Sequence, residues 1–175
     1  FIERLKAKAI CLEYLNIGGG LGIVYDKETP QTADRFAKRI LPLLKKTGLK
    51  IIMEPGRFIV GNAGILVAKV LYVKPTPKKK FVITDAGMND LIRPALYDAY
   101  HKIVPLRGTW DVGRGTKVDV VGPICESGDF FAKARIMPKV SEGEYIAIMG
   151  AGAYGFSMSS NYNSRPRVPE VLVMK

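Results

Sequence analysis

The sequence predicts a two-part fold, with an α/β segment over residues 1–63 and a β-domain over residues 64–175. The first part shows a strand–helix–strand pattern, and the second shows short apolar runs separated by Gly and Pro. The composition, with 47% hydrophobic and 25% charged residues in 175, is typical of a globular chain that forms a sizeable core.

The α/β segment is predicted from two apolar runs with a helix between them. Residues 12–17 predict a short strand that ends in a run of three glycines. Residues 32–46 carry apolar side chains at helical spacing, and residues 50–53 predict a second strand. A strand, a helix and a strand in this order are typical of a parallel β/α unit.

The β-domain is predicted from five short strand-like runs with turns between them. A helical stretch over residues 91–101 interrupts these runs, and residues 168–174 predict a last strand. We therefore expect an antiparallel domain, built as a β-barrel or a sandwich. The five runs are residues 65–73, 81–84, 118–121, 130–136 and 145–149.

The formal net charge of +11 points to anionic partners such as nucleic acid, a membrane surface or a small anion. The basic residues are spread along the chain, and their one dense run, residues 74–80 (KPTPKKK), contains two prolines that favour a solvated turn. No motif interleaves aromatic and basic residues, and no apolar run approaches a membrane span. We therefore expect neither a nucleic-acid nor a membrane partner.

The two cysteines, Cys11 and Cys125, form neither a disulfide framework nor a CxxC metal motif. We expect no metal site and a reducing, cytoplasmic location. Cys11 precedes an apolar strand and is expected in the core. The chain begins at Phe1 in the middle of a pattern, so we expect a further N-terminal portion of the protein.

Two turns that follow strands are candidate ligand-binding elements. Gly18-Gly19-Gly20 allows backbone N–H groups to approach a phosphate. Glu54-Pro55-Gly56-Arg57 places an acid and a base on one tight turn, a pairing suited to opposite ends of a charged heteroaromatic cofactor. In a parallel unit both turns lie at the carboxyl ends of strands, where ligands bind. The alternative is an ordinary glycine turn and a surface ion pair.

A polar loop, residues 122–129 (GPICESGD), holds Cys125 beside Glu126. A cysteine next to an acid and flanked by turn residues is not typical of a core position. Its thiol can donate or accept a proton. The alternative is a half-buried structural cysteine.

Three other side chains are candidates for substrate contact. Arg93 and Tyr97 lie four residues apart and share a face if their segment is helical. An arginine grips a carboxylate through two hydrogen bonds, although a solvated helix face gives the same pattern. Tyr154 lies among small residues that permit close backbone approach. The single histidine, His101, has no partner pattern and is interpreted as structural.

Five segments together resemble the diaminopimelate decarboxylase family, a branch of the fold-type III pyridoxal-phosphate-dependent decarboxylases that also include ornithine decarboxylase. The segments occur in the family's order and span nearly the whole chain, and their joint match is specific although each is short. They are residues 16–25 (NIGGGLGIVY), 54–57 (EPGR), 85–101 (DAGMNDLIRPALYDAYH), 122–129 (GPICESGD) and 150–155 (GAGAYG).

This resemblance implies a fold and a reaction. Residues 1–63 would be the C-terminal units of a racemase-type β/α barrel that binds pyridoxal 5'-phosphate, and the β-domain would follow. The implied reaction is the decarboxylation of meso-diaminopimelate to L-lysine, the last step of lysine biosynthesis, by a head-to-tail homodimer with shared active sites. The family's cofactor lysine lies on an early barrel strand, and no segment of this chain matches that strand.

The resemblance also implies roles for individual residues. The glycine turn would hold the cofactor phosphate, and Glu54 would pair with the pyridine nitrogen and keep it protonated. Cys125 would deliver the proton that replaces CO₂ and would act, with Glu126, across the dimer interface. The implied cofactor contacts are Gly18, Gly19, Gly20, Glu54, Pro55, Gly56, Arg57 and Tyr154. The implied substrate contacts are Arg57, Arg93, Tyr97, Glu126 and Tyr154.

Three other enzyme or regulator classes share parts of this pattern. A decarboxylase of a basic amino acid or polyamine precursor, of the ornithine, arginine or carboxynorspermidine type, shares the EPGR turn and the cysteine loop. Arg93 favours a dicarboxylic substrate instead, because a cation repels an ornithine-like side chain. An amino-acid racemase of the same barrel type is disfavoured by Glu54, since an acid at the pyridine nitrogen favours full electron withdrawal. A non-catalytic regulator would not need the complete cofactor and substrate set.

Overall fold

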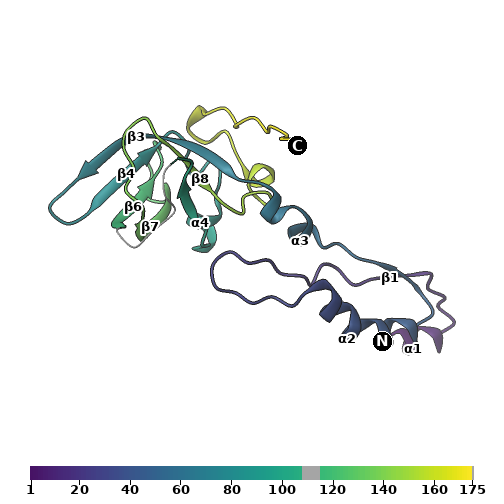
Figure 1. Cartoon of the computed structure of the whole chain (residues 1–175). Helices are drawn as coiled ribbons and strands as arrows, with labels where there is room; N and C mark the ends of the chain where they lie inside the picture. Colours follow the sequence, from purple (N-terminus) through teal and green to yellow (C-terminus); the bar gives the residue numbers. More distant parts are fainter. Residues whose placement is uncertain (108–114, 175) are drawn as a thin grey trace. The chain divides into compact units, whose positions relative to one another are not determined.

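The structure, a computed structural model, describes residues 1–107 and 115–174. The chain divides into two compact units, Phe1–Ile59 (unit 1) and Val60–Lys175 (unit 2). Figure 1 labels the helices and strands of both units.

Unit 1 is built around a parallel β/α arrangement. The strands β1 (Tyr14–Asn16) and β2 (Lys50–Ile52) pair in parallel, and α2 (Ala33–Lys45) connects them. The short helices α1 (Ile2–Lys6) and α3 (Gly56–Val60) lie before β1 and after β2 in the chain. The predicted order of strand, helix and strand, and their parallel pairing, are confirmed.

The helix α2 begins and ends where its sequence predicts. The Thr32 hydroxyl accepts a hydrogen bond from the Arg35 N–H at 3.2 Å and so caps the first turn. At the other end, Gly48 adopts a left-handed φ of +68°, a conformation that glycine reaches at little cost.

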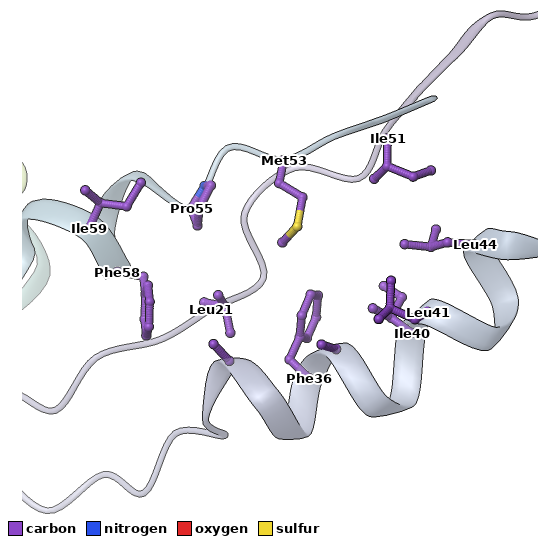
Figure 2. A pocket seen from close by; sticks show the side chains of 12 residues that line it. Leu21, Phe36, Ile40, Leu41, Leu44, Ile51, Met53, Pro55, Phe58 and Ile59 are labelled. Atoms are coloured by element: carbon purple, nitrogen blue, oxygen red, sulfur yellow. The ribbon is translucent and has the colours of Figure 1, made fainter. Parts of the chain in front are cut away.

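The apolar face of α2 looks onto the segment that contains β2. Figure 2 shows Phe36, Ile40 and Leu44 of α2 facing Ile51 and Met53 across a cavity of about 540 Å³. Within residues 1–59, all of which the structure describes, the buried hydrophobic side chains are those of Ile23 and Leu44. Unit 1 therefore leaves most of its apolar side chains partly exposed.

Unit 2 contains a six-stranded mixed sheet in the order β5-β8-β3-β4-β6-β7. Its strands are β3 (Leu66–Pro75), β4 (Lys80–Thr84), β5 (Ile103–Pro105), β6 (Thr116–Val121), β7 (Phe130–Met137) and β8 (Tyr145–Ile148). The helix α4 (Arg93–Tyr97) and three single turns, η1 (Gly61–Ala63), η3 (Phe156–Met158) and η4 (Tyr162–Ser164), complete the regular structure of its described part.

The sheet differs from the predicted antiparallel arrangement at one pair of strands. β4 and β6 run parallel, with Val82 opposite Val120, whereas the other neighbouring strands described in this sheet pair antiparallel. About thirty residues, including α4, separate β4 from β6, and so long a connection can bring the chain back to enter a neighbouring strand in the same direction. The purely antiparallel prediction is therefore wrong.

Three other local predictions need correction. Residues 168–174 form no strand, and Val171–Met174 are more than three-quarters exposed, with no neighbouring strand to cover them in the part of the chain that the structure describes. The short strand β5 was not predicted and pairs with β8. Cys11 lies before β1 and is exposed rather than in the core. The basic run at 74–80 does form the turn between β3 and β4, as predicted.

The core of unit 2 lies under this sheet. Alternate side chains of β3 are buried, from Leu66 through Ala68 to Val70, which is the pattern of a strand with one covered face. Phe131 and Met137 of β7 and Ile146 and Ile148 of β8 belong to the same hydrophobic cluster. This packed sheet is the support for α4 and for the loops described below.

Candidate active site

The glycine turn and the EPGR turn lie side by side in unit 1. The parallel pairing of β1 with β2 continues past the strand ends, where the Ile17 N–H donates to the Ile52 carbonyl at 3.1 Å. The Glu54 N–H then donates to the Gly18 carbonyl at 2.8 Å. The expectation that both turns lie at one end of the parallel unit is confirmed.

Asn16 connects the two turns through its side chain. Its amide group donates to the Glu54 carboxylate, and its Oδ1 accepts a hydrogen bond from the Gly18 N–H at 2.8 Å. Asn16 is the last residue of β1, so the strand itself positions this amide. Sequence reasoning assigned no role to Asn16; its signal is a polar side chain between a strand and a glycine run.

The backbone of the glycine turn favours glycine at each position. Gly18 and Gly20 have left-handed φ values of +68° and +77°. A Cβ atom on Gly19 would lie 3.0 Å from the Glu54 carbonyl oxygen, which is closer than side chains normally approach. The turn is therefore a shallow cradle open to a group that approaches the backbone closely, as a phosphate does. Arg57 belongs to the EPGR turn, which lies beside the glycine turn, and it is exposed in α3.

In unit 2, α4 carries two predicted substrate contacts with opposite exposure. Arg93 is 7% exposed and Tyr97 is 62% exposed, although they lie one turn apart. The helix ends at Asp98, which adopts a left-handed φ of +51°. The alternative in which Arg93 lies on a solvated face is thereby excluded.

The guanidinium of Arg93 is held by a histidine. Its Nη1 lies 3.0 Å from Nε2 of His101, and Nδ1 of the same ring lies 2.9 Å from the Met149 carbonyl oxygen. His101 is fully buried, and this burial, together with the nearby Arg93 and Arg135, lowers the pKa of its imidazole below the ordinary value. The hydrogen bond to Met149 opposes this shift.

The cysteine loop, residues 122–129, is held at its end by Asp129. The two oxygens of this buried carboxylate accept hydrogen bonds from the Met88 N–H at 2.7 Å and the Ile124 N–H at 2.6 Å. Burial raises the pKa of Asp129 above its ordinary value, and both backbone N–H groups oppose the change. A Cβ on Gly122 would lie 2.5 Å from the same carboxylate oxygens.

This anchored loop presents the two residues predicted for chemistry. Cys125 and Glu126 are both exposed, and Oε1 of Glu126 accepts a hydrogen bond from the Gly128 N–H at 3.2 Å. The loop also passes close to α4, because a Cβ on Gly128 would lie 3.8 Å from that of Ala95. Sequence reasoning included Asp129 in the loop but not its anchoring role.

Tyr154 lies beyond β8 in a turn of small residues. It is 43% exposed and has a left-handed φ of +61°. A Cβ on Gly152 would lie 1.9 Å from the Val60 carbonyl oxygen, so the predicted close backbone approach is confirmed there. Met149, the carbonyl partner of His101, lies five residues before Tyr154. The segments of Arg93 and Tyr154 are therefore joined through one imidazole.

Two structural features bear on the kind of site. Among residues 1–107 and 115–174, no helix has the length and apolar character needed to cross a bilayer. Across the same residues, no group of three or more His, Cys, Asp or Glu side chains is arranged to hold a metal ion.

The sequence and the fold match known proteins along most of the chain. Residues 23–152 match the family described as "Pyridoxal-dependent decarboxylase, C-terminal sheet domain". The chain is 52% identical over 174 residues to the diaminopimelate decarboxylase of Aquifex aeolicus and 53% identical over 173 residues to that of Haemophilus influenzae. Both matches extend over 98% of this chain, and they cover 40% and 41% of the two relatives.

A solved structure shows the same fold. The diaminopimelate decarboxylase of Helicobacter pylori, crystallised in complex with L-lysine, superimposes with a TM-score of 0.86 at 44% identity over 95% of this chain and 41% of that chain. The chain thus spans about two-fifths of the length of the proteins it resembles. From the family match over most of its length, the chain belongs to the pyridoxal-dependent decarboxylases.

Proposed function

We propose that the protein containing this chain catalyses the pyridoxal-phosphate-dependent decarboxylation of meso-diaminopimelate to L-lysine. The observation that carries the proposal is the placement of the glycine turn beside Glu54, in a chain about half identical to proteins named diaminopimelate decarboxylase. The same proposal assigns the domains. Residues 1–63 are the end of a cofactor-binding β/α barrel, and residues 64–175 are a β-domain for substrate and dimer contacts.

The residues at the two turns of unit 1 fit pyridoxal 5'-phosphate. The cradle at Gly18–Gly20, which a Cβ on Gly19 would partly fill, suits a phosphate. Pro55, Gly56 and Arg57 follow Glu54 in the turn that is hydrogen-bonded to this cradle. When bound, this cofactor withdraws the electrons released as CO₂ leaves.

Glu54 supports that chemistry by charge. Its carboxylate, held by the Asn16 amide, is the partner that keeps the pyridine nitrogen protonated. Asn16 orients the carboxylate and, through Gly18, the phosphate turn at the same time.

Arginine and tyrosine side chains supply the proposed substrate contacts. Arg93 grips the distal carboxylate, and Arg57, Tyr97 and Tyr154 complete the contacts. L-Lysine keeps the L centre of meso-diaminopimelate, so CO₂ leaves from the D centre and Arg93 binds the carboxylate of the L centre.

Decarboxylation replaces CO₂ with a proton, and Cys125 supplies it. The thiol is exposed on a loop anchored by Asp129, beside Glu126, which binds the distal amino group. Both residues act across a two-fold interface in a homodimer with shared sites. A reactive free thiol also fits a reducing, cytoplasmic location.

A substrate comparison tests the proposed function. We expect the full-length protein, supplied with pyridoxal 5'-phosphate, to form L-lysine and CO₂ in equal amounts from meso-diaminopimelate. D-Lysine keeps the reacting centre and the distal amino group but lacks the distal carboxylate, so its kcat/KM should be at least about tenfold lower. The Arg93→Ala variant should narrow this gap. Preferential decarboxylation of L-ornithine or L-lysine would contradict the proposal and favour a basic amino-acid decarboxylase.

A further inference from the structure

We propose that His101 is a positioning residue that orients the Arg93 guanidinium toward the distal carboxylate of the substrate. The inference rests on the proposed function, because it takes Arg93 as the carboxylate contact. It adds a residue that touches neither substrate nor cofactor and acts through Arg93.

The two hydrogen bonds of the imidazole fix its tautomer. The Met149 carbonyl oxygen can only accept, so Nδ1 of His101 carries the proton and donates it across 2.9 Å. A guanidinium can only donate, so Nε2, 3.0 Å from Nη1 of Arg93, presents its lone pair. The ring is therefore neutral, with both nitrogens used in complementary roles.

The surroundings keep the imidazole neutral and still. His101 is fully buried, and the guanidinium groups of Arg93 and Arg135 both act on its imidazole. Nη1 of Arg135 donates to the His101 carbonyl at 2.8 Å, so the backbone is held as well as the ring. Protonation of the buried ring would add a positive charge beside two guanidinium groups, which desolvation and repulsion both oppose.

The hydrogen bond between Nη1 and His101 fixes one edge of the planar Arg93 guanidinium, and the orientation of this group decides how well it binds a carboxylate. An arginine binds a carboxylate best when two parallel N–H groups point at its two oxygens. A buried guanidinium that loses the acceptor at Nη1 must turn to find another partner, since an unsatisfied buried donor is costly. Loss of the Nε2 acceptor should therefore weaken binding of ligands that carry the distal carboxylate, and only those.

Two substitutions separate the two hydrogen bonds of His101. In His101→Gln, the side-chain oxygen can take the place of Nε2 as the acceptor for Arg93. In His101→Asn, the shorter amide can replace Nδ1 as the donor to Met149 but does not replace Nε2 as the acceptor for Nη1 of Arg93. A purely structural role predicts that both variants weaken every ligand alike.

Equilibrium binding by calorimetry to the full-length, cofactor-loaded protein provides the test. The probes are L-lysine, which carries the carboxylate, and cadaverine, which is lysine without it. We expect His101→Asn to weaken L-lysine binding about tenfold and to change cadaverine binding less than about twofold. His101→Gln should stay within about threefold of wild type for both probes. The double variant that combines His101→Asn with Arg93→Ala should lose no more affinity for L-lysine than Arg93→Ala alone, because the two residues act through one contact.

The outcomes distinguish this inference from the proposed function. If Arg93→Ala weakens L-lysine selectively and His101→Asn does not, His101 does not position Arg93 and the inference is overturned. Equal weakening of L-lysine and cadaverine in both histidine variants also overturns it, in favour of a structural role. If wild type does not prefer L-lysine, or Arg93→Ala changes nothing, the substrate role of Arg93 fails and the inference fails with it.

Discussion

Single polar side chains set the geometry of the candidate site. The Asn16 amide joins Glu54 to the glycine turn, His101 joins Arg93 to Met149, and the Asp129 carboxylate anchors the cysteine loop. Each of the three contacts groups far away in the sequence. Replacing any one of these three residues should therefore displace functional groups that belong to other residues.

Replacing Glu54 by Gln removes charge but little volume. Gln keeps an oxygen that can accept from the Asn16 amide, so the two turns should stay together. The ring nitrogen of the cofactor loses its anionic partner, and each unit by which the pKa of that nitrogen falls is about 1.4 kcal/mol, or about tenfold in its protonated fraction. We expect kcat to fall at least tenfold on that scale in steady-state assays, with circular dichroism unchanged. A variant with wild-type kcat would rule out this role for Glu54.

The pH dependence of stability tests the neutral state of His101. Its pKa is lowered in the folded protein, first by burial and then by Arg93 and Arg135, so the unfolded chain takes up the proton first as pH falls. The stability contributed by the neutral ring is complete above the ordinary histidine pKa of about 6.5 and is lost below it. His101→Gln does not titrate at this position. As the pH falls from about 8 to about 5, the thermal midpoint of wild type should therefore fall relative to that of His101→Gln, and the gap between the two should shrink.

The raised pKa values of the buried Asp90 and Asp129 act in the opposite direction. They are present in both proteins and cancel in the difference between wild type and His101→Gln. A gap between the two midpoints that stays constant across this pH range would contradict a neutral, buried imidazole.

At the scale of elements, the glycine turn and the strand ends form one rigid corner. Gly19→Ala should distort it, because the new Cβ would lie 3.0 Å from the Glu54 carbonyl oxygen. Loss of one charge-assisted hydrogen bond to the phosphate costs about 1.5–3 kcal/mol, so the dissociation constant of the cofactor should rise about tenfold or more.

Gly48→Ala is the control for that substitution. Gly48 also has a left-handed φ of +68°, so alanine there costs stability, but it lies beyond α2 with nothing within 4 Å of a new Cβ. Spectroscopic titration with the cofactor should show wild-type affinity for Gly48→Ala and weaker affinity for Gly19→Ala. Equal affinities would show that the phosphate does not use this turn.

Local patterns predicted the elements well where one segment determines its own structure. The helix predicted over residues 32–46 is α2, Ala33–Lys45, because its apolar spacing and the Thr32 cap are both local signals. The glycine and EPGR turns were predicted as neighbours because parallel strands share an end.

Predictions failed where a distant partner decides. The direction of β6 depends on the long connection from β4, and no local pattern reports it. Residues 168–174 are apolar enough for a strand but have no neighbour to pair with in the described chain. Likewise, the sequence showed no partner for His101, because Arg93 of α4 and Met149 after β8 meet it only in the folded unit.

At the scale of the whole molecule, the two units divide the proposed work. Unit 1 carries the cofactor turn and Glu54, and unit 2 carries Arg93, Cys125 and Tyr154. Unit 1 buries few apolar side chains by itself, which supports the proposal that it is part of a larger β/α barrel. The central claim is that Glu54 and Cys125 serve one decarboxylation, in sites that two chains share.

Mixing two inactive full-length variants, Cys125→Ala and Glu54→Ala, tests this claim most directly. If each site takes Glu54 from one chain and Cys125 from the other, a mixed dimer places both lesions in one site and leaves the other intact. Random pairing makes about half of the dimers mixed, so activity should return to roughly a quarter of wild type once subunit exchange is shown by mass. Mixed dimers that form and remain inactive would contradict the account.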